Sequence, residues 1–109
     1  MLEVTFFRDG RDQFRALSAR GHTDFADHGE DIVCAAVSAI LQAARLGLER
    51  YAGIAPAAAQ SSGEMELGWS AAEAELESVR AIVATAEMAI AEIAGRYPEH
   101  VRLTISPQG

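Results

Sequence analysis

Apolar residues recur at every second position in three stretches of the chain, residues 2–6, 65–69 and 101–105. A period of two predicts strands with one buried face. Residues 12–20 show a blurred form of this alternation and follow an Asp-Gly pair, so we expect them to form a hairpin with the first strand. Residues 54–60 contain a proline and several alanines, which favours a weak or edge strand.

Two other stretches carry the three- and four-residue spacing of amphipathic helices. The first is expected to run to about Tyr51, with Asp31 as its N-cap, which places Cys34 at the third helical position. The second and longer helix follows a capping-box pattern that begins at Ser70, and a glycine and a proline close it. Leu76 is the first residue of its expected buried stripe.

The order of the expected elements is ββαββαβ, without an internal repeat or a linker. This order predicts an α+β fold in which two helices pack on one mixed or antiparallel sheet. With 109 residues, of which 50% are hydrophobic, the chain is expected to form a single domain over residues 1–109. A chain of this length buries roughly 65% of its unfolded surface, which is enough for one core.

Composition limits the kinds of partner. The formal net charge is −7, which argues against a nucleic-acid surface and suits a basic protein partner. The single cysteine excludes an internal disulfide and fits a reducing compartment. No apolar run approaches the roughly 20 residues of a membrane span, and the N-terminus alternates instead of forming a signal-peptide block. We therefore expect a cytoplasmic protein that does not contact a membrane.

The candidate chemistry lies between residues 21 and 40. Cys34 stands just inside a helix start, where unpaired N–H groups and the helix dipole stabilise a thiolate. His22 stands at the end of the second strand, a short loop away, and an imidazole can accept the thiol proton and return it to a leaving amine. The pair predicts a thiol nucleophile with its base. From the residues alone, a small buried cysteine and a structural histidine stay open as alternatives.

Other chemistries find weaker support. His28 is a rival for the role of general base. His22, His28 and Cys34 are possible zinc ligands and nearby aspartates add oxygens, but the intervals are long and no CxxC or HExxH spacing occurs, so neither a metal nor another cofactor is expected. A redox sensor lacks a resolving cysteine. A serine hydrolase lacks the GxSxG elbow.

Gly21-His22 and the run DIVCAAVSA that begins at Asp31 resemble the signature of the bacterial ribosomal-processing cysteine protease family Prp. The resemblance implies a small homodimeric α/β enzyme that removes the N-terminal extension of large-subunit ribosomal protein twenty-seven. It assigns the nucleophile to Cys34 and the general base and acid to His22. Thr23 and Phe25 depart from the alanine and tyrosine that are usual in the family.

Residues 23–30 separate the two candidate catalytic residues and are polar. Gly21 and Gly29 are expected hinges of a gating or substrate-binding loop, in which Thr23 and Phe25 take part, although an ordinary surface connection explains the composition as well. Asp31 is a supporting candidate that either orients His22 or only caps the helix.

Ser38, one turn after Cys34, is either a minor site residue or part of the polar helix face. A long second helix rich in alanine, isoleucine and valine has apolar surface in excess of what a small sheet covers, so we expect a homodimer with two-fold symmetry. The competing function is a non-catalytic module that binds a peptide or a ribosomal protein with the same loop and groove.

Overall fold

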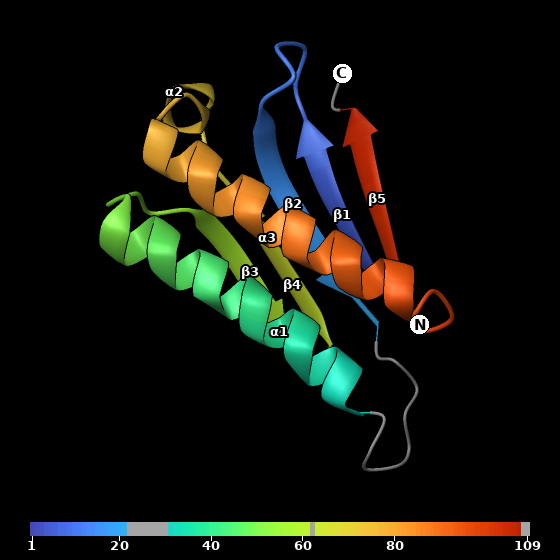
Figure 1. The fold of residues 1–109 in the computed structure, drawn as a ribbon. Helices are drawn as coiled ribbons and strands as arrows, with labels where there is room; N and C mark the ends of the chain where they lie inside the picture. Colours follow the sequence, from blue (N-terminus) through green and yellow to red (C-terminus); the bar gives the residue numbers. More distant parts are fainter. Residues whose placement is uncertain (22–30, 62, 108–109) are drawn as a thin grey trace.

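A five-stranded mixed sheet carries helices on one of its faces (Figure 1). This arrangement comes from a computed structural model, which describes residues 1–21, 31–61 and 63–107. The strand order is β3-β4-β2-β1-β5. The elements along the chain are β1 (Leu2–Arg8), β2 (Phe14–Arg20), α1 (Asp31–Leu46), a π-helical segment η1 (Gly47–Tyr51), β3 (Ala57–Ser61), β4 (Glu64–Gly68), α2 (Ala71–Ala74), α3 (Glu77–Arg96) and β5 (Val101–Pro107).

The sheet is mixed because β5 returns beside β1 in parallel, whereas the other neighbouring strands are antiparallel. Phe6 in β1 pairs with Leu17 of β2 on one side and with Ile105 of β5 on the other. The expected α+β fold and the hairpin of the first two strands are therefore confirmed. Strand β2 begins at Phe14 and not near residue 12, because the preceding residues form the turn around the Asp9 carboxylate.

The hydrophobic core lies between the helices and the covered face of the sheet. Phe6 and Leu17 fill its centre from the strands, and α1 and α3 pack against each other above them. The buried positions of α3 recur at three- and four-residue steps, as its amphipathic sequence predicts. The largest fully buried side chains are Phe6, Leu17, Leu48, Ile90, Val4, Val37, Val79, Val83 and Val101.

The prediction of one continuous second helix is wrong. The capping box is present, with the Ser70 hydroxyl accepting from the Glu73 N–H at 3.1 Å, but it begins the short helix α2. Leu76 then adopts an extended backbone with ψ 131° and is 44% exposed, so it is not part of the buried stripe. Ala74 and Val79 are both fully buried. On a continuous helix residues five apart point roughly 140° away from each other, so the break lets both face the core.

Helix α1 begins one residue earlier than expected. Asp31 is its first helical residue and not its N-cap, which makes Cys34 the fourth helical residue. Strand β3 also starts later than expected, at Ala57, but it is the edge strand that the proline predicted. Ile105, expected on the buried face of the last strand, is 41% exposed because it lies near the end of β5.

The helical stretch Ile32–Tyr51 is long and apolar enough to cross a membrane by length and composition, with a mean hydropathy of 1.5. This differs from the expectation that no run of the chain approaches such a length. The core helix of a domain meets the same criteria. Of this window 28% is buried inside the fold, and Val37, Leu41 and Leu48 are among its residues that belong to the core.

Candidate active site

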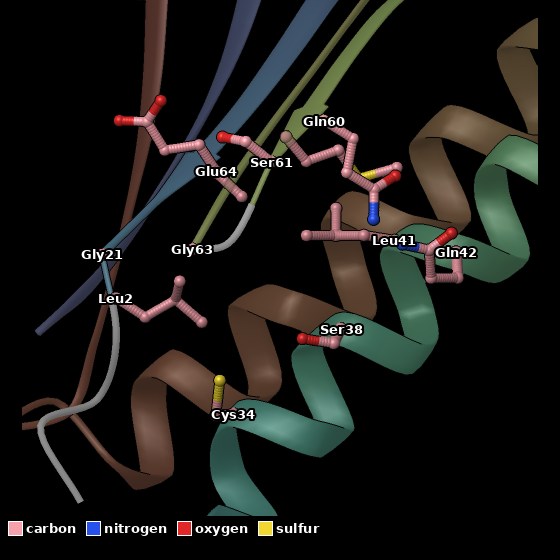
Figure 2. Close-up of a pocket in the computed structure, with 12 residues that line it drawn as sticks. Leu2, Gly21, Cys34, Ser38, Leu41, Gln42, Gln60, Ser61, Gly63 and Glu64 are labelled. Atoms are coloured by element: carbon pink, nitrogen blue, oxygen red, sulfur yellow. The ribbon is translucent and has the colours of Figure 1, made fainter.

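A pocket of about 140 Å³ lies between the first half of α1 and the sheet edge formed by β3 and β4 (Figure 2). Its floor is apolar, because Leu2, Ala19, Leu41 and Met65 are all at least 90% buried. Its rim is polar and comes from α1 and from the ends of the strands. The pocket is lined by Leu2, Ala19, Gly21, Cys34, Ser38, Leu41, Gln42, Gln60, Ser61, Gly63, Glu64 and Met65.

Helical periodicity brings Cys34 and Ser38 to this pocket together. Residues four apart lie one above the other on the same face of a helix. Cys34 carries a free thiol that is partly exposed, and Figure 2 shows it directed from α1 towards the side of the pocket where Leu2 lies. The chain therefore presents its one thiol to a pocket with an apolar floor and hydrogen-bonding groups around it, the kind of concave surface that holds a ligand by shape and orients it with a few polar groups.

Gly21 directly follows β2 at the opposite wall of the pocket. Its φ is +90°, and a Cβ at this position would lie 2.5 Å from the main-chain oxygen of Met1. Its N–H donates to the carbonyl oxygen of Gly63 at 2.9 Å, which fixes the end of β2 against the β3–β4 connection. The backbone here requires glycine for conformational and steric reasons together.

The family model of the cysteine protease Prp matches residues 1–102. This chain belongs to the Prp family of cysteine proteases. The resemblance found in the sequence is thereby confirmed, and with it the prediction that the protein is a peptide-bond hydrolase of the thiol class. Among proteins with curated functions, none matches the chain.

Solved structures share the fold over nearly the whole chain. A protein from Streptococcus mutans is 26% identical with a TM-score of 0.87, and the match covers 99% of this chain and 96% of that one. The essential ribosomal processing protease Prp from Staphylococcus aureus, in complex with a substrate peptide, is 20% identical with a TM-score of 0.87, covering 97% and 100%. The same protease with a covalently linked product peptide is 22% identical with a TM-score of 0.84, covering 97% and 100%.

The structure places part of the predicted site. It brings Gly21, Cys34 and Ser38 to one pocket. His22, Thr23, Phe25 and Gly29 lie outside the described residues, as do the rival base His28 and two of the aspartates considered as metal ligands, Asp24 and Asp27. Asp31 is described only as the first residue of α1. Within residues 1–21, 31–61 and 63–107, no three histidine, cysteine, aspartate or glutamate side chains form a group suited to a metal ion.

Sequence reasoning missed the wall that β3 and β4 contribute. Gln60, Ser61 and Glu64 line the pocket, although they follow Cys34 by about 26 to 30 residues in the sequence. Arg45 of α1 is linked to this wall, since its Nη1 donates to Gln60 Oε1 at 3.1 Å and its Nε donates to Glu49 Oε2 at 3.2 Å. The only local signals were the i,i+4 spacing of Arg45 and Glu49 and the edge-strand character of β3.

Proposed function

We propose that this protease removes the N-terminal extension of large-subunit ribosomal protein twenty-seven, with Cys34 as the nucleophile and His22 as the general base and acid. One observation carries the proposal. A cysteine protease requires a thiolate, and the only cysteine of this sequence opens onto a pocket of about 140 Å³ at the start of α1.

In the proposed reaction the Cys34 sulfur attacks the scissile carbonyl while His22 accepts the thiol proton. His22 then gives that proton to the leaving amine, which departs and leaves a thioester on Cys34. Water, deprotonated by His22, hydrolyses the thioester and restores the thiol. The unpaired backbone N–H groups in the first turn of α1, before Cys34, are suited to hold the oxyanion that forms in each half-reaction.

The choice of substrate rests on three supporting facts. The Prp of Staphylococcus aureus is described as a ribosomal processing protease and binds a substrate peptide. The net charge of −7 favours association with a basic ribosomal protein. The apolar floor of the pocket suits an apolar or aromatic side chain of the peptide, and Phe25 is proposed to add a contact from the loop that Gly21 and Gly29 bracket.

We also propose that the enzyme is a cytoplasmic homodimer that binds neither nucleic acid nor membrane. The outer surfaces of α1 and α3 form an apolar groove whose walls include Ile40 and Ile82 and several alanines. A two-fold partner would remove this groove from water. The cytoplasm is proposed because a nucleophilic thiol has to stay reduced.

The test uses a synthetic peptide that spans the N-terminal extension and the first residues of the mature ribosomal protein of the host. Mass spectrometry of the products identifies the cleaved bond. Cys34→Ala should lower turnover by at least roughly 10³-fold while the fold persists. His22→Ala should lower it by roughly 10²- to 10⁴-fold, which is the contribution of a general base.

His28→Ala is the matched control and should retain most activity. An active Cys34→Ala variant contradicts the nucleophile assignment, and an inactive His28 variant beside an active His22 variant exchanges their roles. A wild-type protein that binds the peptide and leaves it intact supports the non-catalytic binding module for this substrate instead.

A further inference from the structure

We infer that Gln60 is a substrate-binding residue of this protease and that Arg45 is the positioning residue that orients it. The Gln60 side-chain amide donates a hydrogen bond to a backbone carbonyl of the bound peptide. The inference rests on the proposed use of the Cys34 pocket and adds a specificity element on its sheet side. It concerns neither the nucleophile nor its base.

The register of the sheet places Gln60 on the helix-covered side. Gln60 of β3 pairs directly with Met65 of β4, so the two side chains project from the same face. Met65 is 95% buried in the pocket floor, whereas Gln60 lies on the exposed edge strand and forms part of the pocket wall. A peptide that enters between α1 and β3 therefore passes the Gln60 side chain.

Arg45 determines which end of the amide faces the pocket. A guanidinium group has only donors, so its 3.1 Å contact with Gln60 has to engage the amide oxygen. The Arg45–Glu49 contact at 3.2 Å holds the guanidinium in turn. The amide nitrogen of Gln60 is thus turned away from Arg45, and Figure 2 shows it pointing from β3 towards α1.

The oriented amide nitrogen is a donor without a protein acceptor among the described residues. An extended peptide has acceptors at regular intervals, because each of its residues carries a carbonyl oxygen. When a peptide enters the pocket and displaces water, such an oxygen needs a new donor. Gln60 supplies one that is neutral and already oriented, so it selects for a peptide backbone without demanding a particular side chain.

The first experiment measures alkylation of Cys34, which is unambiguous because the chain has one cysteine. The probes are a phenylalanine-containing tripeptidyl chloromethyl ketone and iodoacetamide. With the ketone, the sulfur forms a bond to the methylene carbon and chloride leaves. The peptidyl probe uses peptide recognition and iodoacetamide does not, so the ratio of their rates isolates the recognition step.

Gln60→Glu keeps an acceptor for Arg45 and removes the donor. It should lower the rate with the peptidyl probe roughly three- to tenfold and leave the iodoacetamide rate unchanged. Arg45→Ala should show a loss of the same kind, and Arg45→Ala combined with Gln60→Ala should lose no more than Gln60→Ala alone. Arg80→Ala is the matched control, because it removes an exposed ion pair with Glu77 on α3, away from this pocket.

Equal rate ratios for Gln60→Glu, Arg80→Ala and the wild type overturn the inference. The inference is also overturned if the rate of Cys34 alkylation in the wild type does not depend on the peptide part of the probe. Additive losses for Arg45 and Gln60 overturn the positioning role. Cleavage of the ribosomal peptide is measured separately. If the wild type does not cleave that peptide but Gln60→Glu still lowers the ratio of the two alkylation rates, the proposed substrate is contradicted and the role of Gln60 is supported. Where cleavage occurs, Gln60→Glu should raise KM and largely preserve kcat.

Discussion

Replacement of Gly21 by alanine tests how the end of β2 is held beside the active-site pocket. The residue combines a φ of +90° with a Cβ position only 2.5 Å from the Met1 main-chain oxygen. Contacts of a real Cβ are essentially never shorter than 3.0 Å, so the strand ends have to separate by at least about 0.5 Å. The atom that blocks the methyl group is backbone, which cannot turn aside as a flexible side chain does.

Two other glycines of the chain allow the free-energy cost of the positive φ to be separated from the cost of the steric overlap. Gly53 also has a positive φ, +72°, but no atom lies within 4 Å of the position that an alanine methyl group would take, so alanine there costs only the left-handed conformation, about 1–2 kcal/mol. Gly10 has neither a neighbour nor a positive φ, and its change to alanine should stay within about 0.5 kcal/mol. Gly21→Ala adds overpacking of about 1–3 kcal/mol to the same conformational cost, so its total is about 2–5 kcal/mol.

Urea unfolding at constant pH measures the three variants against the wild type. Gly21→Ala should destabilise the fold most, Gly53→Ala less and Gly10→Ala least. The destabilisation expected for Gly21→Ala corresponds to a loss of roughly 10 °C or more in Tm. Peptidase activity is then measured at a temperature where every variant is folded. Gly21→Ala should lose about tenfold or more in kcat/KM, since its strand end forms a wall of the pocket, and Gly53→Ala should retain the wild-type value.

Equal destabilisation by Gly21→Ala and Gly53→Ala would refute the steric part of this reasoning, because both share the positive φ. A Gly21→Ala variant that is destabilised but fully active would show that the end of β2 does not shape the site. If neither Gly21→Ala nor Gly53→Ala destabilises the fold measurably, the argument from the positive φ is refuted as well.

Three further outcomes are expected. The pKa of Asp9 is lowered from its ordinary value of 3.8, mainly because the Gln13 backbone N–H donates to its carboxylate. The resulting stabilisation is present above the ordinary pKa and is lost as the pH falls through the lower native pKa. The urea midpoints of the wild type and Asp9→Asn should therefore differ at neutral pH and converge in acid, and a difference that stays constant with pH contradicts this. Ser70→Ala removes the cap of α2 and should cost about 1 kcal/mol in urea unfolding; no measurable cost would show that the capping box is not stabilising. Light scattering at micromolar concentration should give twice the 11.6 kDa chain mass, and the monomer mass would refute the proposed dimer.

The sequence by itself determined the elements whose signals are local. Alternation in residues 2–6 and 65–69 marked strands because a half-buried strand needs apolar residues on one face only. The stripe through Val79, Val83 and Ile90 marked a helix for the corresponding reason. The GH pair and the DIVCAAVSA run indicated the protease family. Cys34 was predicted as the nucleophile because nucleophilic chemistry depends on residue type.

Where local signals compete, only the tertiary structure decided which element forms and where it lies. The capping box at Ser70 predicted one long helix, but burial of both Ala74 and Val79 requires the break at Leu76. The edge-strand character of β3 was visible in the sequence, whereas its position beside α1 was not. That position depends on the strand order β3-β4-β2-β1-β5, which non-local pairing determines.

The pocket shows the same division. Cys34 and Ser38 were expected near each other because four residues make about one helical turn, a relation that the sequence contains, and both line the pocket. Gln60 and its contact with Arg45 were not found, because they join an edge strand to a helix across a fold that the sequence does not state. A side chain acquires a binding role of this kind only when packing brings two distant segments together, and that packing is a property of the whole core.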